Sequence, residues 1–465
     1  MKKIVICIGI LMFSSCNRMI ELVPISQHST ANFYNNETEL DQALTAAYNS
    51  IRSTHQYGGN GYSSFMEVTS DNTWNTNTTM AGGAYASFDN FTLTSNNIQI
   101  SNTWVSCFDT VQRSNIVISR LKNSENISEE FKNKKMSEAL FLRALTYFNM
   151  VRIWGGVPLI TAEITDVNEA FQHTRATEEK VYAQIVEDLE FAVKHLPVQY
   201  ESNDIGRVTN GAAKTLLAKV FLTQKNWAKA KTLLDEVVNS NQYKLVSDFS
   251  KVFSVDNKNN EESIFEVQFS KTLEGQGYMG GNPLILGQDV NNLPSDNLLA
   301  LFDDNLDDRK NASVVKLDNL GWRMSKWQDT FGSNGGLDFN IIVLRFADVL
   351  LMNAEVQNEL AYGTPQALDY LNQVRERSNA RLYSYTELNT QEKFRNAIEK
   401  ERRLELAFEN HRWFDLVRIG KAIETMNNSR GASVFPISIS AKNLLFPIPQ
   451  SQIDASGGKL AQNPL

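Results

Sequence analysis

Apolar and polar positions between residues 211 and 240 recur with the period of an α-helix, and the pattern is interrupted once, at Asn226 and Trp227. The segment reads GAAKTLLAKVFLTQKNWAKAKTLLDEVVNS, and its small and apolar positions are Leu217, Ala218, Phe221, Ala230, Leu234 and Val237. These positions match those of a tetratricopeptide repeat, in which a short turn joins two antiparallel helices. The alanines allow the two helices to approach closely, while the larger residues fill the groove toward the next pair. The pattern therefore predicts a helical pair with its turn at Asn226.

A second helical pair is predicted between residues 343 and 377, which read VLRFADVLLMNAEVQNELAYGTPQALDYLNQVRER. Ala367, Leu371 and Val374 reproduce the spacing of the second helix after a turn that runs from Gly363 to Pro365. This match is looser than the first. Taken alone, the spacing also fits a generic helical bundle.

A third pair begins with SEALFLRALTYFNMVRIW, residues 137–154, where apolar residues cover two stripes of one helix. The stripes consist of Leu140, Ala144, Tyr147, Val151 and Trp154 on one side, and of Phe141, Leu145 and Phe148 beside it. A helix that is apolar over so wide an arc is buried between its neighbours. Its partner, at residues 178–197, follows only after the break GGVPLI, so we expect this pair to carry an insertion.

Two long stretches, near residues 55–97 and 270–340, are rich in Gly, Asn, Ser and Thr and differ in character from the helical pairs. Long irregular segments are usually functional or disordered, and the many aromatic residues here argue against disorder. The alternating segment SIFEVQFS, residues 263–270, predicts a short β-strand. The sequence thus predicts a mainly α fold, a superhelix of tetratricopeptide-like helical pairs with long loop insertions that contain short β-strands.

The N-terminus, MKKIVICIGILMFSSC, has the layout of an export signal, with two lysines, an apolar run and small residues before Cys16. The apolar run of about ten residues is too short to span a bilayer. SSC at this distance from Met1 resembles a bacterial lipobox, in which the cysteine is acylated and becomes the first residue. We therefore expect a lipoprotein signal peptide at residues 1–15, a single domain at residues 16–465 and an acyl anchor on Cys16. An ordinary secretory signal and a buried first strand are the alternatives.

Composition and charge agree with an exported globular protein whose stability comes from a large core. The 465-residue chain is 42% hydrophobic, and removal of Lys2 and Lys3 with the signal leaves 43 basic against 53 acidic residues. This acidic balance gives no reason to expect a nucleic-acid partner. Without Cys7 and with Cys16 acylated, Cys107 has no partner for a disulfide.

The segment EKERRLELAFENHRWFDLVRIGK, residues 399–421, concentrates charged residues and is expected to be helical. On a helix, residues three apart are neighbours, which predicts structural ion pairs. The expected pairs are Arg402 with Glu405, Glu409 with Arg412, Arg412 with Asp415, and Asp415 with Arg418. The alternative is a glycosidase that uses Glu405 and Glu409 as acid and nucleophile. Two glutamates on one side of one helix do not face each other across a sugar, and nearby arginines lower both pKa values, so no catalytic residue is predicted.

Other enzyme and metal signatures are missing from the sequence. The five histidines, at positions 28, 55, 173, 195 and 411, include no pair at metal-binding spacing, and neither HExxH nor CxxC occurs. LFDDNLDDRK, residues 301–310, lacks the glycine and final glutamate of an EF-hand loop and is expected to be a polar helix end. The sequence predicts neither a cofactor nor a metal site.

Several segments in order resemble the SusD/RagB family of Bacteroidetes surface lipoproteins. They are SSC, FLRALTYFNMVRIWGGVPLI, AAKTLLAKVFLTQKNWAKA, LRFADVLLMNAEVQN, LNQVRERSNA, EKERRLELAFENHRWFDLVRIG, LLFPIPQSQID and QNP. The resemblance implies a non-enzymatic, lipid-anchored outer-membrane protein at the cell surface. Such a protein captures an oligosaccharide and delivers it to a SusC-like TonB-dependent transporter, for which it acts as a lid. A RagB-like peptide receptor on the same scaffold and a surface glycoside hydrolase are the alternatives.

The two insertions are the expected ligand-binding face. Sugars present C–H faces to aromatic rings and hydroxyls to amides and carboxylates, and SDNTWNTN offers both kinds of partner. The resemblance implies a shallow aromatic platform made by an early loop and the later insertion. The candidate glycan-binding residues are Asp71, Asn72, Trp74, Tyr85, Tyr278, Trp322, Trp327 and Tyr383. The alternative is that these rings pin the long loops to the helical body.

Overall fold

The computed structural model describes residues 33–59, 61–75, 80–280, 292–302, 306–333, 335–429 and 438–464. The expected signal peptide and Cys16 lie outside these residues. Within them, no helix is both long enough and apolar enough to cross a membrane. Cys107 is a buried free thiol, and burial raises its pKa to about 12.

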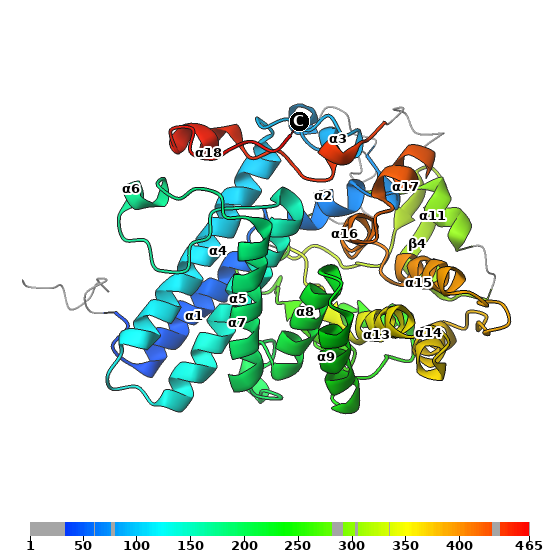
Figure 1. Cartoon of the computed structure of the whole chain (residues 1–465), viewed down its shortest axis with the longest axis horizontal. Coiled ribbons are helices and arrows are strands. Elements are labelled where there is room, and N and C mark those ends of the chain that lie inside the picture. The colour runs from blue at the N-terminus through cyan, green and yellow to red at the C-terminus, as the bar shows by residue number, and fades with distance from the viewer. Residues whose placement is uncertain are drawn as a thin grey trace, which may run out of the picture.

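Eight helices pack one against the next in chain order and form the body of the protein. They are α1 (Glu37–Ile51), α4 (Ile98–Asn123), α5 (Glu129–Trp154), α7 (Glu178–His195), α8 (Asn210–Thr223), α9 (Trp227–Asn239), α13 (Phe346–Leu360) and α14 (Pro365–Arg377). Figure 1 shows them following one another across the molecule from α1 to α14. α15 (Gln391–Glu405) packs on α13 and α14 at the far end. The predicted superhelix of helical pairs is confirmed.

α5 illustrates why these segments form helices and how they are buried. It begins after Ser128, whose side chain accepts a hydrogen bond from the Phe131 N–H, and its first turn carries two glutamates beside the positive end of the helix dipole. It ends at Gly155, whose φ of 70° favours glycine. Between residues 135 and 154 every residue except Arg152 is buried. The two adjacent apolar stripes therefore do mark a helix enclosed by neighbours, here α4 and α7.

The other predicted pairs also form, with one change at a boundary. Asn226 caps α9 through a hydrogen bond from the Lys229 N–H, so the α8–α9 turn lies where the pattern placed it. Val343, Leu344 and Arg345 are not helical, because they end a β-strand and α13 begins only at Phe346. The apolar run IIVL favours an extended chain, and a partner strand is available beside it.

Three short antiparallel two-stranded sheets lie in or beside the insertions. β2 (Ser263–Val267) pairs with β6 (Ile341–Arg345), β1 (Thr73–Trp74) with β3 (Leu293–Pro294), and β4 (Val314–Leu317) with β5 (Gly321–Met324). The predicted strand in SIFEVQFS is confirmed as β2.

Short helices complete the described chain. They are α2 (Tyr62–Val68), α3 (Ala86–Asp89), α6 (Val167–Ala170), α10 (Phe249–Val252), α11 (Asp296–Leu301), α12 (Arg309–Ser313), α16 (Arg412–Arg418), α17 (Ala422–Ser429) and α18 (Gln450–Ala455). In Figure 1, α2, α11, α16, α17 and β4 gather beside α15, above the α13 end of the stack. The two insertions thus meet the C-terminal part of the chain at one end of the molecule.

Candidate functional site

Two tryptophans nominated from different insertions, Trp74 and Trp322, lie on two strands that both contact a third. Trp74 is in β1, which pairs with β3, and β3 packs against β5, which carries Trp322. Both side chains are partly exposed. The fold therefore places two partly exposed indoles, almost 250 residues apart in the chain, on strands that both contact β3.

Trp322 has one side against the protein and one cation nearby. Its ring packs on a small apolar cluster formed by Leu298, Phe302, Val314, Leu404, Ala407 and Phe408. The Lys310 Nζ lies 5.9 Å from the ring centroid, and Lys316 is the cross-strand neighbour on β4. An indole held on one side and partly exposed on the other has the geometry of a stacking surface.

Asp71 and Asn72, which were expected to bind sugar hydroxyls, are buried, so this prediction is wrong for the structure described. Arg412 Nε donates to Asp71 Oδ1 over 2.7 Å, and Arg403 Nε donates to Asn72 Oδ1 over 2.9 Å. Burial alone would raise the pKa of Asp71, but Arg403 and Arg412 outweigh it and lower that pKa. These polar atoms are occupied by protein partners. They fix the backbone just before Trp74 instead of facing a ligand.

Three of the nominated aromatic residues are also buried, and they pin loops as the alternative proposed. Tyr85 is 5% exposed, and burial raises its pKa to about 12. Tyr278 packs edge-on to Phe269 at 5.6 Å between ring centroids. Trp327 Nε1 donates to the Phe408 carbonyl over 3.1 Å. A ring enclosed on both faces cannot stack on a sugar, so these three assignments are wrong for the described structure.

Tyr383 is partly exposed but lies in the connection between α14 and α15. Arg375 lies over its ring at 4.2 Å from the centroid, and its backbone N–H donates to Asn372 Oδ1. These contacts explain its position without a ligand. Trp74 and Trp322 are the two nominated residues that are partly exposed and lie on strands joined through β3.

The charged segment 399–421 is not one helix. α15 ends at Glu405, α16 begins at Arg412, and Phe408 and Asn410 between them have φ values of 66° and 63°. The Glu67 carboxylate accepts hydrogen bonds from the N–H groups of both residues, over 2.8 and 2.9 Å. The bend therefore depends on a residue of the first insertion, which sequence periodicity could not reveal.

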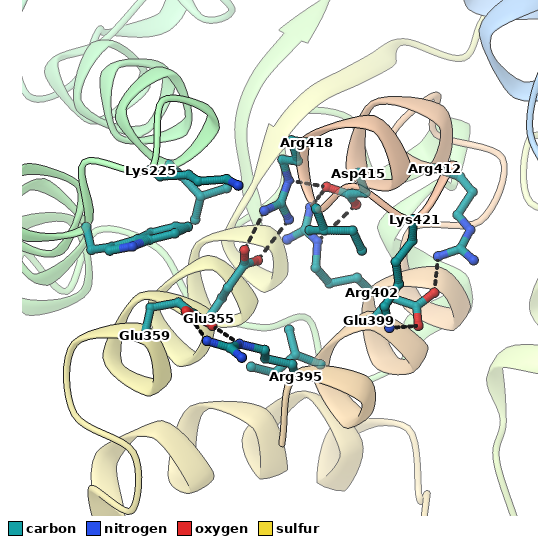
Figure 2. A pocket seen from close by; sticks show the side chains of 14 residues that line it. Lys225, Glu355, Glu359, Arg395, Glu399, Arg402, Arg412, Asp415, Arg418 and Lys421 are labelled. Atoms are coloured by element: carbon teal, nitrogen blue, oxygen red, sulfur yellow. Dashed lines mark hydrogen bonds and ion pairs between the residues drawn. The ribbon is translucent and has the colours of Figure 1, made fainter. Parts of the chain in front are cut away.

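All six nominated ion-pair residues form buried ion pairs, but only one of the four expected pairings occurs. Arg418 Nε donates to Asp415 Oδ1 over 2.8 Å as predicted. Arg402 pairs instead with Asp348 and Asp415, and Arg412 with Asp71 and Glu399. Figure 2 shows the Arg402, Arg412 and Arg418 pairs around one pocket. The bend places only Glu409 and Arg412 on different sides of a helix boundary. Arg402 and Glu405 share α15, and Arg412 and Asp415 share α16, but their side chains pair with other elements instead.

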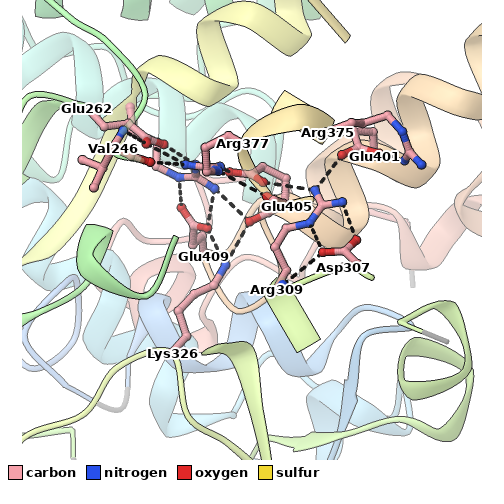
Figure 3. Close-up of polar contacts among 12 residues, drawn as sticks. Val246, Glu262, Asp307, Arg309, Lys326, Arg375, Arg377, Glu401, Glu405 and Glu409 are labelled. Carbon is pink, nitrogen blue, oxygen red and sulfur yellow. Dashed lines mark hydrogen bonds and ion pairs between the residues drawn. The ribbon is translucent and has the colours of Figure 1, made fainter. Parts of the chain in front are cut away.

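Glu405 and Glu409 lie at the centre of a larger network, shown in Figure 3. Glu405 pairs with Arg309, Arg345 and Arg377, while Glu409 pairs with Arg345 and Lys326. Both glutamates and Arg345 are at most 1% exposed at the side chain. The network also includes Glu262, Asp307, Arg375 and Glu401. None of these partners was predicted from the sequence; the available signal was charged residues inside apolar runs, such as Arg345 after IIVL.

The electrostatics of this network oppose acid–base catalysis. Burial alone would raise the pKa of Glu405, but Arg377, Arg345 and Arg309 hold its pKa well below the usual range. Glu409 has its pKa lowered by Arg345 and Lys326, again against the effect of burial. A general acid needs a raised pKa, so both carboxylates have the wrong shift for that role.

The network joins both insertions to the helical body. Lys326 and Arg309 come from the later insertion, and Asp71 and Glu67 from the earlier one. All four have polar contacts with residues 401–412. This segment is therefore a scaffold beneath the Trp74 and Trp322 strands. Among the described residues, no group of three or more His, Cys, Asp or Glu side chains could hold a metal ion.

Sequence similarity to known proteins covers most of the chain. The sequence model of the SusD family matches residues 303–465, and one described as "Starch-binding associating with outer membrane" matches residues 21–222. A SusD-like protein of Formosa agariphila is 27% identical, covering 95% of this chain and 94% of the relative. The starch-binding protein SusD of Bacteroides thetaiotaomicron is 26% identical over 37% of this chain and 32% of its own length.

Solved structures show the same fold. A laminarin binding SusD-like protein has a TM-score of 0.78 and 28% identity, covering 93% of this chain and all of the other. The surface glycan-binding protein A of Bacteroides thetaiotaomicron in complex with laminarihexaose has a TM-score of 0.77 and 22% identity. It covers 92% of this chain and 99% of the other.

Proposed function

Because the chain belongs to the SusD/RagB family, we propose that it is a non-enzymatic surface protein that binds an oligosaccharide on the Trp74 and Trp322 strands. The observation that carries the proposal is that two partly exposed tryptophans, from separate insertions, lie on strands that both contact β3. A laminarin binding relative of 28% identity supports the ligand class.

The arrangement suits a shallow platform for a glycan. Trp322 is held by the apolar cluster behind it, and Trp74 by the β1–β3 pairing. The buried Asp71 and Asn72 contacts keep the loop before Trp74 in place. A rigid aromatic surface loses little conformational entropy when a sugar stacks on it.

Calorimetric titration of a glycan panel that includes laminarihexaose tests this proposal. Truncation of a stacked ring costs roughly 1–3 kcal/mol of binding free energy, so Trp74→Ala and Trp322→Ala are each expected to weaken binding at least fivefold. Phe171→Ala is the matched control, because this aromatic is 37% exposed but lies beyond α6. Unchanged affinity in both tryptophan variants would remove the platform from this region, and binding of peptides alone would favour a RagB-like receptor.

We also propose that Cys16 is acylated, that the protein is anchored in the outer membrane, and that it acts as the lid of a SusC-like TonB-dependent transporter. The lipobox-like SSC and the family support these steps. Cys16→Ala should release the protein from membranes in cells that lack the transporter. Co-purification from detergent-solubilised membranes tests the complex, and recovery of a lone monomer under conditions that preserve related complexes would contradict it.

A further inference from the structure

A charged pocket lies between α9, α13, α15 and α16. Its volume is about 370 Å³, within the range of about 300–1,000 Å³ that small-molecule sites occupy. The lining residues are Leu222, Lys225, Trp227, Glu355, Glu359, Arg395, Ile398, Glu399, Arg402, Arg412, Asp415, Arg418, Ile419 and Lys421. This pocket does not include Trp74 or Trp322.

The pocket carries an excess of positive charge in an acidic protein. Its lining contains six lysines and arginines but four carboxylates, whereas the chain as a whole has a net charge of −8. A partly enclosed region of one sign concentrates ions of the opposite sign, because its walls have a low dielectric constant. Arg402 and Arg412 also pair with Asp348 and Asp71 outside the lining, so among the described residues the positive charge that no acid takes up is that of Lys225. This lysine favours an anionic ligand.

The four carboxylates are already neutralised by arginines. Arg395 holds Glu359 through two hydrogen bonds of 2.6 and 2.7 Å, and Arg418 holds Glu355 in the same bidentate way. Arg412 Nη1 donates to Glu399 Oε1 over 2.6 Å. Figure 2 shows these pairs lining the wall of the pocket. A carboxylate held by an arginine keeps acceptor sites that can receive hydrogen bonds from ligand hydroxyls.

Lys225 supplies positive charge that these pairs do not use, whereas Lys421 is part of them. Lys225 is exposed and forms no ion pair within the part of the chain that the structure describes. Lys421 Nζ donates to Asn396 Oδ1 over 2.7 Å and lies 3.8 Å from Glu399 Oε2. The Lys225 ammonium group is thus available to a ligand carboxylate, whereas the Lys421 ammonium group already has protein partners.

The remaining wall is apolar. Trp227 is partly exposed, and Leu222, Ile398 and Ile419 lie beside it in the lining. An indole and aliphatic side chains accept the C–H face of a sugar ring, while paired charges bind its hydroxyls. We propose that this pocket is a second binding site, for a uronate residue of an acidic saccharide, with Lys225 binding the carboxylate and Trp227 contacting the ring. It is independent of the proposed Trp74 and Trp322 platform.

Calorimetry on the full chain in detergent, with digalacturonate, D-glucuronate and neutral galactobiose as probes, tests the site. At least one of the acidic probes is expected to bind about tenfold more tightly than galactobiose, with an affinity that falls as salt is added. Binding of neither acid, or equal binding of the neutral and acidic sugars, would overturn the proposal.

Substitutions show which residues bind the acidic probe. Lys225→Glu, at an exposed position outside the helices, should lower the affinity for the acidic probe at least fivefold. Trp227→Ala should lower it about tenfold. Lys400→Ala is the control, because Lys400 is exposed on α15 but does not line the pocket. Trp74→Ala with Trp322→Ala should leave this affinity unchanged. If that double variant no longer binds the acidic probe while Lys225→Glu still binds it, the pocket assignment is wrong and the Trp74 and Trp322 platform binds the acid.

Discussion

The helical stack and the insertion end of the molecule are stabilised in different ways. In the stack, helices such as α5 bury apolar side chains around most of their circumference, and Leu142 and Phe141 are fully enclosed. At the insertion end, the short strands and α16 meet over a buried network of guanidinium and carboxylate groups. Apolar contacts are non-directional and tolerate small shifts, whereas a buried charge needs its partner at hydrogen-bond distance. The insertion end is therefore positioned mainly by specific charged pairs. The stack is positioned mainly by buried apolar area, with a few buried pairs such as Arg143 and Asp188.

Lowering the pH should destabilise the insertion end more than the helical stack, and this is the largest effect that we expect. The pKa values of Asp348, Glu405, Glu409 and Asp415 are lowered in the folded state, where lysines and arginines outweigh the effect of burial. A carboxylate with a lowered folded pKa contributes stability above its unfolded pKa of about 4, and loses it as the pH falls toward the folded value. We expect the free energy of unfolding, measured in urea, to fall steeply below about pH 5. A flat profile between about pH 5 and pH 3 would contradict the role given to the network.

The next largest effect is expected for Glu405→Ala at neutral pH. The substitution leaves Arg309, Arg345 and Arg377 without a shared carboxylate in a buried place, which typically costs about 3–5 kcal/mol. Urea unfolding should show the loss. Glu376→Ala on the exposed side of α14 is the control and should be nearly neutral. A Glu405→Ala variant as stable as the parent would mean that the network does not hold the insertions.

Leu142→Ala tests how much buried apolar side chains stabilise the helical stack. Its side chain is fully buried in α5, so the cavity left by truncation should cost about 2–4 kcal/mol. Because no titrating partner is lost, this cost should be the same at pH 7 and pH 5. A cost that changed with pH would show that the stack also depends on its charges.

The smallest effect is expected for the exposed pair Asp109 and Arg113 on α4. Their side chains are 49% and 44% exposed, and Arg113 Nε lies 2.8 Å from Asp109 Oδ2. Exposed pairs of this kind contribute about 0.3–0.5 kcal/mol. Asp109→Ala should therefore lie close to the parent in urea, and a loss near that of Glu405→Ala would show that burial is not what separates the two kinds of pair.

The sequence by itself determined the helical pairs, the turn at Asn226 and the strand β2. These follow from the spacing of apolar residues over one or two dozen positions, and that spacing is set locally by the helix and strand periods. It also marked Trp74 and Trp322 as surface candidates and residues 399–421 as structural.

Only the tertiary structure decided the partners of the charges and the exposure of the rings. Glu67 lies more than 300 residues from the bend that it holds at Phe408, and Asp71 equally far from Arg412. Trp322 and Trp327 are five residues apart, yet one is partly exposed and the other donates to a carbonyl inside the core. Burial and ion pairing are properties of residues distant in the chain that meet on folding, so no local period encodes them.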